Sequence, residues 1–397
     1  MTTLDSARPA PPIPDRVPLR RWLGVVAVAV GTFSVVTVEQ LPVGLLTSVG
    51  GSLEVSEGTA GLMVTVPGLV ASATAPILPV AIGRMNRRIV LLGLIVLMVL
   101  ANVMSALAPT FAVLLAARFL VGISIGGFWA LAAGIAVRLV PTTYIPQATA
   151  LTFGGATAAN VLGVPAGTLI GGLTDWRVAF AAVGGLGLLV VIALFVLLPS
   201  MPATQPVRLR TLAEQLRNRA VRVGIISTFL LVSGHFAAFT FVSPILQTIA
   251  RIDNGLVGPL LLAFGVAGIV GNFIVGSVAS RNLRGTVITI SVMLAAILAL
   301  FPVVGDGGIG GVCLLILWGL AFGGVPVSVQ TWILQAAPRS AEAATALNTS
   351  VFNLAIALGA LFGGLVADNV AIAGVLWFGS ALAVLTSFAV ARVRKSD

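Results

Sequence analysis

Two stretches of the sequence, Leu120-Val-Gly-Ile-Ser-Ile-Gly-Gly127 and Leu317-Trp-Gly-Leu-Ala-Phe-Gly-Gly324, repeat one pattern at an offset of 197 residues. A second pair of segments repeats at nearly the same offset, 196 residues: Ala150-Leu151 precedes Gly163 and Gly167, and Ala346-Leu347 precedes Gly359 and Gly363. The sequence therefore predicts two copies of one structural unit. Parallel six-helix repeats with a substrate site between them are typical of membrane transporters.

Both copies are strongly apolar. Of the 397 residues, 58% are hydrophobic and only 9% are charged, whereas a soluble domain carries about 25% charged residues. Lipid must therefore surround most of the chain. A membrane helix needs roughly 20 apolar residues, and cuts at polar and turn clusters give twelve such spans: 22–48, 58–82, 88–107, 111–137, 147–172, 178–199, 222–246, 255–279, 286–304, 309–334, 343–366 and 371–391.

One long polar segment interrupts the middle of the chain, over residues 200–221. It separates an N-terminal six-helix bundle, 22–199, from a C-terminal one, 222–391, and leaves polar tails at 1–21 and 392–397. The first tail is rich in proline, so we expect it to be disordered. In the linker, Leu209, Leu212 and Leu216 have the spacing of an amphipathic surface helix. The fold class predicted is an all-α membrane protein of twelve transmembrane helices in two pseudo-symmetric bundles.

The positive charges predict the orientation. With the N-terminus in the cytoplasm, 19 of the 22 Lys and Arg residues fall on the cytoplasmic side, as the positive-inside rule requires. Both termini are thus expected in the cytoplasm. The net charge of +10 does not indicate nucleic acid, because the basic residues lie at the ends of apolar spans, where they contact lipid headgroups.

Residue counts exclude several kinds of site. The single cysteine, Cys313, rules out an internal disulfide and a cysteine metal cluster, and the single histidine, His235, rules out a multi-histidine metal site. The only lysine, Lys395, lies in the C-terminal tail, so the chain has no phosphate-binding loop with its lysine. We expect no cofactor and no metal. An intramembrane enzyme would need a nucleophile with its base, which this composition disfavours.

Away from the ends of the predicted spans, Glu39 is the only carboxylate and Arg118 is the only permanent cation. An ionisable group in hydrocarbon is costly and usually functional. Counted from the outer ends of their spans, both lie roughly 12–14 Å deep, which permits an ion pair or a relay through water. Burial favours a neutral carboxyl group and a nearby guanidinium favours the charged form, so Glu39 is a candidate proton site. The alternatives are a static pair, a carboxylate that caps backbone near Pro42, and a packing role for Arg118.

Further polar and aromatic residues inside the spans are candidates for substrate contact. His235 can donate, accept or titrate near neutrality, and aromatic rings stack on planar ligands. The alternatives are a satisfied buried histidine, lipid-facing rings, and amides that bond between helices. The proton-coupling set is Glu39, Arg118 and His235, and the substrate set is Gln40, Phe128, Trp129, Asn160, His235, Phe239, Asn272, Gln330 and Asn353.

Several segments resemble the major facilitator superfamily, in its drug/proton antiporter family with twelve spans. They are Val38-Glu-Gln-Leu-Pro-Val-Gly-Leu-Leu-Thr47, Arg84-Met-Asn-Arg-Arg88, Arg118-Phe-Leu-Val-Gly122 and Gly163-Val-Pro-Ala-Gly167. Within that family, Ser56-Glu-Gly-Thr-Ala-Gly61, Gly126-Gly-Phe-Trp-Ala130 and Arg138-Leu-Val-Pro141 are most similar to bacterial purine ribonucleoside efflux pumps.

The resemblance implies a monomer in the bacterial inner membrane that exports a small planar compound, a purine nucleoside or an analogue, in exchange for protons by alternating access. Multidrug or sugar efflux and proton-coupled uptake are the alternatives. It also implies that Arg84, Arg87 and Arg88 form a conformational loop. This chain departs from the family pattern at two positions of the loop, with Gly83 in place of an Asp and Asn86 in place of a Gly. Because the Asp would help to latch the two halves through charge contacts, we do not expect that latch here. A non-transporting sensor would need a signalling domain, and the longest soluble segment is the linker.

Overall fold

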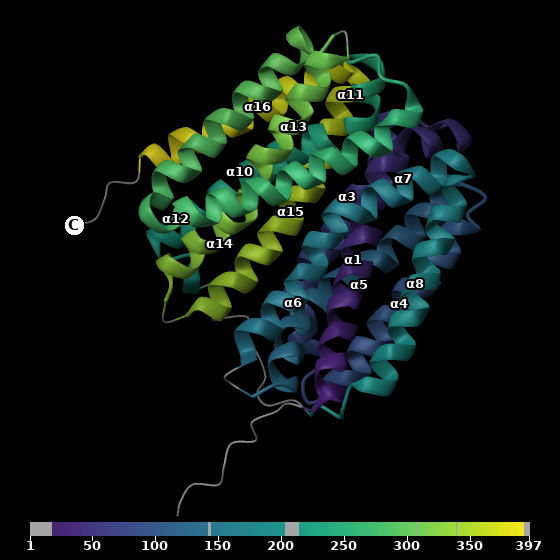
Figure 1. Cartoon of the computed structure of the whole chain (residues 1–397), viewed down its shortest axis with the longest axis vertical. Coiled ribbons are helices and arrows are strands. Elements are labelled where there is room, and N and C mark those ends of the chain that lie inside the picture. Colours follow the sequence, from purple (N-terminus) through teal and green to yellow (C-terminus); the bar gives the residue numbers. More distant parts are fainter. Residues whose placement is uncertain (1–17, 142–143, 203–213, 307, 339, 393–397) are drawn as a thin grey trace, which may run out of the picture.

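A computed structural model describes residues 18–141, 144–202, 214–306, 308–338 and 340–392. The described residues form α-helices and one short π-helix, and no strand (Figure 1). The helices are α1 (Leu19–Ser52), α2 (Glu57–Ala60), α3 (Leu62–Ala81), α4 (Arg87–Ala106), α5 (Phe111–Leu139), α6 (Ile145–Ala158), η2 (Ala159–Gly163), α7 (Val164–Leu173), α8 (Trp176–Leu197), α10 (Arg219–Phe239), α11 (Val242–Thr248), α12 (Asn254–Val304), α13 (Ile309–Gly323), α14 (Val325–Ala336), α15 (Ala341–Asn369) and α16 (Ile372–Ala391).

Twelve helical segments of the described chain are long and apolar enough to cross a membrane, which confirms the number predicted from sequence. Five of the spans begin at a side chain that caps the first free amides: Ser56, Asn86, Thr110, Asp175 and Asn218 each accept a hydrogen bond from a backbone N–H two or three residues on. Such capping satisfies donors that have no partner within the helix.

Some spans are interrupted in ways that apolar length does not reveal. The fifth span contains the π-helix η2, the seventh breaks between α10 and α11, and the tenth breaks at Gly324, directly before α14. The eighth and ninth spans, predicted as separate, are two helices that meet at a kink inside α12, where Asn282 has non-helical dihedral angles. The linker residues Leu209 and Leu212 and the two tails beyond 18 and 392 lie outside the described residues, so the domain boundaries remain a prediction.

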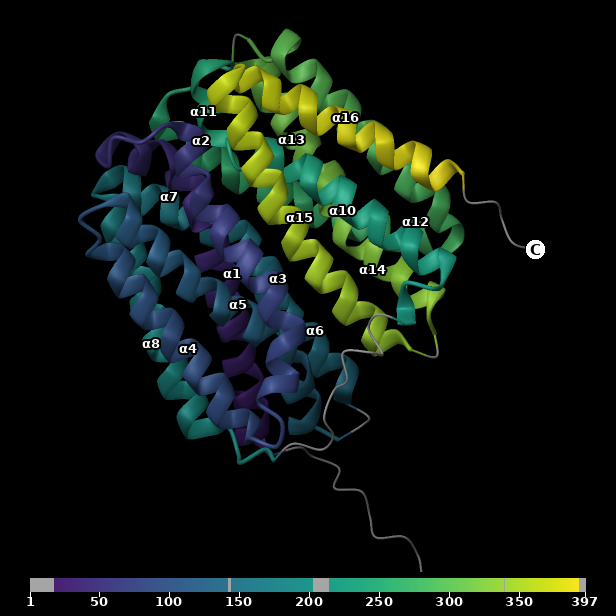
Figure 2. The same ribbon diagram turned by 180° about the vertical axis from the view of Figure 1, so that it is seen from behind.

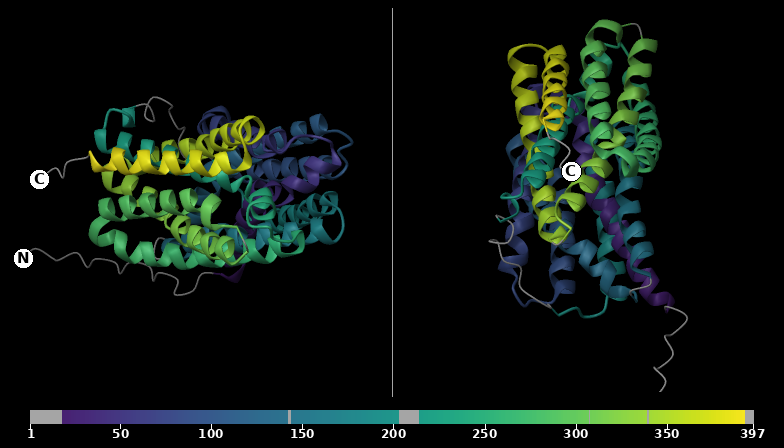
Figure 3. Two further views of the ribbon diagram at one scale, coloured as in Figure 1. Left: turned by 90° about the horizontal axis from the view of Figure 1, so that it is seen from above. Right: turned by 90° about the vertical axis from the view of Figure 1, so that its left-hand side faces the viewer.

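The two bundles meet at one end and diverge toward the other (Figures 1 and 2). The first helix begins, and the last helix ends, on the side where the linker joins the bundles. We call this the linker side, and the opposite one the distal side. Figure 3 shows the same separation from two further directions. Between the bundles, α3 packs on α15 and α7 packs on α12.

The repeated glycines that open the sequence analysis make equivalent contacts in the two bundles. Gly122 and Gly126 of α5 lie against the backbone of α3, at Pro67 and Ala71, and Gly319 and Gly323 of α13 lie against the backbone of α12, at Phe264 and Gly268. The second repeat behaves in the same way: Gly163 and Gly167 meet α1, and Gly359 and Gly363 meet α10. Small residues at these positions allow close approach of helix backbones in a membrane.

These contacts predict that Gly323→Ala destabilises the protein strongly. A Cβ at Gly323 would overlap the carbonyl oxygen of Gly268, a backbone atom that cannot rotate away. The helices must then separate, and we expect a fall in melting temperature of several degrees or loss of folded protein. Gly93→Ala is the matched control, because a Cβ there would meet no atom within 4 Å. Thermal unfolding in detergent measures both, and equal stability of the two variants would contradict the prediction.

Candidate functional site

One face of α1 is left open by the other helices of its bundle. Along it, Val26 and Val30 are about two-fifths exposed, and Phe33, Gln40 and Gly44 are half-buried. These positions recur every three or four residues, or at twice that spacing, so they share one side of the helix. Near the distal end of α1, the carbonyl oxygen of Val43 accepts a hydrogen bond of 3.3 Å from Ser243 Oγ of α11. The distal end of α1 therefore contacts the C-terminal bundle.

Arg118 of α5 is fully buried and reaches the backbone of α1 beside Glu39. Its Nη1 donates a hydrogen bond of 3.0 Å to the carbonyl oxygen of Val38, and its guanidinium lies 5.0 Å from the centre of the Phe180 ring. Within α1, the carbonyl of Val38 would normally accept from the residue four positions on, but that residue is Pro42, which has no N–H. Arg118 thus supplies the donor that Pro42 lacks, while its Nε and Nη2 have no recorded partner among the described residues.

Glu39 precedes Gln40 by one position, about 100° around α1, and is half-buried. Among the described residues, its carboxylate has no recorded hydrogen bond or ion pair, and Arg118 is bound to Val38 instead. The structure thus brings the two groups to neighbouring positions on α1 without pairing them. A carboxyl group without a fixed partner can take up or release a proton when water reaches it.

Trp129 of α5 stacks on Phe153 of α6, with ring centroids 5.9 Å apart. Trp129 is half-buried and Phe153 is 45% exposed. Both helices flank α1, and Gly155 of α6 lies against α1 at Ala29 and Phe33. The two rings are therefore partly exposed where α5 and α6 meet beside α1, and Phe153 does not share the side of α6 that contacts α1. Sequence reasoning missed Phe153, which no motif or periodicity marks.

Phe128, the neighbour of Trp129, is placed differently. Its ring is fully buried, and a Cβ at Gly31 of α1 would touch both this ring and Val190 of α8. Phe128 thus fills the interior of the N-terminal bundle behind α1. Its position gives no support to the predicted contact with a substrate.

His235 of α10 lies in a cluster of aromatic rings in the C-terminal bundle. Trp318 Nε1 donates a hydrogen bond of 3.0 Å to His235 Nδ1, so the imidazole is neutral and carries its proton on Nε2. Its ring stacks on Phe322 on one side, at 3.3 Å between centroids, and on Phe239 at 4.8 Å. Phe264 extends the stack beyond Phe239. His235 is only 1% exposed, and Phe322, which the sequence analysis did not select, is the half-buried member.

The predicted amide residues divide into bonded and unbonded groups. Gln330 of α14 donates to Thr345 Oγ1 of α15 at 2.9 Å, as the alternative of an amide that bonds between helices predicts. Asn353 donates at 2.9 Å to the carbonyl of Thr349, one turn earlier in its own helix, so it bonds within α15. Asn160 is exposed on η2, and Asn272 and Gln40 are half-buried. For these three side chains no hydrogen bond is recorded within the described part of the chain, so their amide groups can face a ligand.

The loop of Arg84, Arg87 and Arg88 contacts its own bundle and the first linker residues. Asn86 donates to Ser200 Oγ at 2.6 Å and accepts from the backbone of Met201 at 3.0 Å, and Arg88 donates to the carbonyl of Phe195. Arg84 is exposed, next to Gly83, whose φ of 44° favours glycine. Asn86, the departure from the family pattern, thus holds the start of the linker.

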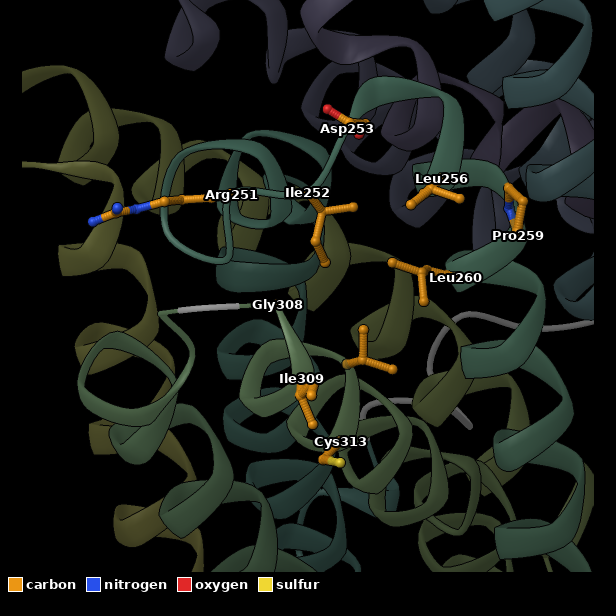
Figure 4. Close-up of a pocket in the computed structure, with 10 residues that line it drawn as sticks. Arg251, Ile252, Asp253, Leu256, Pro259, Leu260, Gly308, Ile309 and Cys313 are labelled. Carbon is orange, nitrogen blue, oxygen red and sulfur yellow. The ribbon is translucent and has the colours of Figure 1, made fainter.

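A separate pocket of about 500 Å³ opens at the distal end of the C-terminal bundle (Figure 4). It is lined mainly by apolar side chains of α12 and α13, among them Leu256, Leu260 and Ile309, with Cys313 at one end. Arg251 is on its border and forms an ion pair with Asp306 at 3.0 Å. No residue of the predicted site lines this pocket, so we do not assign it to the site.

Comparison with known proteins gives consistent matches over nearly the whole chain. The family model described as Major Facilitator Superfamily matches residues 28–360. Among curated proteins, the chain is 34% identical over 377 residues to the purine ribonucleoside efflux pump NepI of Salmonella typhimurium, covering 95% of both chains. It is 35% identical over 371 residues to the transcription regulatory protein OpdE of Pseudomonas aeruginosa, covering 92% of both.

Solved structures show the same fold at low sequence identity. The human organic anion transporter MFSD10 superimposes with a TM-score of 0.68 at 19% identity, over 94% of this chain and 100% of that one. A bacterial homologue of the human lysosomal transporter Spinster, solved in an inward-facing and unoccupied conformation, gives a TM-score of 0.69 at 15% identity, over 95% of both chains.

Proposed function

The chain belongs to the Major Facilitator Superfamily, and on that premise we propose that it exports a small planar organic compound, a purine nucleoside or an analogue, in exchange for protons. The observation that carries the proposal is Glu39, a half-buried carboxylate in the middle of α1 without a recorded partner among the described residues. A proton site at this depth can be reached from one side of the membrane at a time when the bundles rock.

The partly exposed aromatic residues support the proposal that the substrate is planar. Trp129 and Phe153 offer a partly exposed stacked pair beside α1, and Phe322 offers the half-buried ring of the His235 stack. Stacking recognises any flat ring, so hydrogen bonds must select a base. Gln40 and the amides without recorded partners, Asn160 and Asn272, are suited to that role. The name of the Salmonella relative supports a nucleoside among planar compounds.

We further propose that the linker side faces the cytoplasm of a bacterium, with the protein in the inner membrane. The positive-inside rule supports this orientation, because the basic residues gather at the linker-side ends of the spans. The diverging linker side then faces inward, ready to receive a substrate from the cytoplasm (Figure 2). In this state Arg118 binds Val38, which leaves Glu39 free to hold a proton.

Flux measurements in proteoliposomes test the proposal. The purified protein is reconstituted, and radiolabelled adenosine, a sugar and a cationic dye are followed with and without an imposed pH gradient. We expect adenosine flux that the gradient drives in the direction opposite to the protons. Flux of the dye or the sugar alone would favour multidrug or sugar efflux. Absence of flux for all three compounds would refute transport of these classes. It would favour a regulatory role, as the name of the Pseudomonas relative, transcription regulatory protein OpdE, describes for that protein.

The stacked pair gives a prediction for substrate affinity. Phe153→Ala removes the more exposed ring, and an aromatic stacking contact is worth about 0.5–1.5 kcal/mol beyond area burial. We expect the adenosine Kd to rise by about twofold to tenfold, with the pH dependence of transport retained. Phe388→Ala is the control, because Phe388 is similarly exposed, at 59%, but lies on α16 away from α1. Equal affinities of both variants would remove this pair from the substrate site.

A further inference from the structure

The distal side of the molecule is joined by one carboxylate that crosses between the bundles. Asp368, at the end of α15, accepts a hydrogen bond of 2.6 Å from Ser56 Oγ and one of 2.9 Å from the backbone N–H of Gly58. Ser56 also caps the short helix α2, since its Oγ accepts from the backbone N–H of Thr59 at 3.1 Å. The carboxylate of the C-terminal bundle thus binds the first turn of the second span of the N-terminal bundle.

The two backbones approach so closely here that only glycine fits. A Cβ at Gly58 would overlap both Asp368 Cγ and the carbonyl oxygen of Gly364, and a Cβ at Gly364 would lie 2.9 Å from the carbonyl oxygen of Gly58. Nearby, a Cβ at Gly61 would lie 2.9 Å from the Phe241 ring of the C-terminal bundle. We call the contact of Ser56, Gly58, Gly364 and Asp368 the distal clasp.

The clasp lies where the bundles meet and not where they diverge. Nearer the middle of the helices, Ser350 Oγ of α15 donates a hydrogen bond of 2.7 Å to the carbonyl of Ser72 of α3, which also crosses between the bundles. At the linker-side ends of the spans, the side-chain hydrogen bonds recorded for the described residues stay within one bundle and its adjoining linker end, as those of Asn86 and Asn218 do. The distal side must open if a substrate site between the bundles is to face both sides of the membrane in turn. Both hydrogen bonds of Asp368 must then break, because their donors and acceptor belong to different bundles.

We infer that Asp368 is a positioning residue that sets the balance between the closed and the open distal side through the distal clasp. The inference rests on alternating access, which is part of the proposed function. Hydrogen bonds to an ionised acceptor are about twice as strong as those between neutral groups. They stabilise only the state in which the distal side is closed, so their loss shifts the populations toward the state in which it is open.

Distances between spin labels measure this balance without substrate or protons. In a Cys313→Ser background, one label pair at Leu107 and Ile309 reports on the distal side, and a second pair at Met85 and Gln335 reports on the linker side. All four positions are exposed. Asp368→Ala is expected to raise the distal-open population by about tenfold. The distal pair should lengthen while the linker-side pair shortens.

Asn369→Ala is the matched control, because Asn369 follows Asp368 on the same helix but its Nδ2 bonds only to Leu365 of that helix, at 2.8 Å. Ser56→Ala removes one of the two bonds and should give a smaller shift in the same direction. Gly58→Ala should also open the distal side, but by steric overlap, because the added Cβ would force the two backbones apart. If Asp368→Ala does not fold, Ser56→Ala and Gly58→Ala decide the question.

Unchanged distance distributions in the folded variants would overturn the inference. A lower melting temperature without a change in either distance would show that the clasp only stabilises the fold. Because no substrate is added, a failure here leaves nucleoside export untouched. If the protein does not transport adenosine, the distances between the spin labels still test the inference about Asp368 independently.

Discussion

Glu39→Gln is expected to abolish transport driven by a pH gradient. The amide keeps the size and hydrogen-bonding capacity of the side chain but cannot take up a proton at physiological pH. Glu39 is the one carboxylate that falls inside the spans predicted from sequence, and its half-buried position on α1 leaves it accessible. We expect adenosine accumulation against its gradient to fall to the background level, with the Kd changed by no more than about threefold.

Glu54→Gln is the control for this substitution. It makes the same chemical change at an exposed position beyond the end of α1. Its accumulation should match that of the unmodified protein. Active accumulation by Glu39→Gln at the normal rate would eliminate Glu39 as the proton site and leave coupling to a different group.

Arg118→Ala is expected to lower both transport and stability, and a second substitution separates the two effects. The variant leaves the carbonyl of Val38 without a donor, because Pro42 cannot supply one. A buried unsatisfied carbonyl costs about 1–3 kcal/mol. Adding Pro42→Ala restores an N–H that can bond Val38 within α1. The double variant should therefore regain part of the melting temperature but none of the pH-driven transport.

Recovery of transport in the double variant would contradict a role of Arg118 in coupling. It would show that the guanidinium only completes the hydrogen bonding of α1.

Arg118→Lys gives a finer test, because lysine keeps the charge but loses the planar group that lies over the Phe180 ring. We expect it to be more stable than Arg118→Ala and to transport poorly.

The architecture was largely predictable because its signals are local or periodic. Lipid requires long apolar helices, so the number of spans follows from hydropathy. The glycine repeats at an offset of 197 residues become equivalent helix contacts at Gly126 and Gly323. The breaks at η2 and at Gly324 were not predicted, because they do not shorten the apolar run.

The candidate site was predicted only in part. Pro42 lies four residues after Val38, so the sequence shows that the carbonyl of Val38 lacks its usual N–H donor. It does not show that Arg118 provides the donor instead. The sequence placed Arg118 at the depth of Glu39, and the structure shows that its partner is the backbone one residue earlier. Phe153, Phe322 and Asp368 were missed because their roles depend on contacts between distant helices. Ser56 and Asp368, for example, are 312 residues apart in the chain.

The movement of protons caused by a substrate gradient tests the central claim most directly. Proteoliposomes are loaded with adenosine and a pH-sensitive dye at equal internal and external pH, then diluted into medium without adenosine. If the protein exchanges a nucleoside for protons, the exit of adenosine must bring protons in, so the account predicts acidification of the lumen that is absent in Glu39→Gln. An alkaline shift would show movement of both in one direction, and adenosine exit with no change in pH would show uncoupled transport; either result would contradict the account.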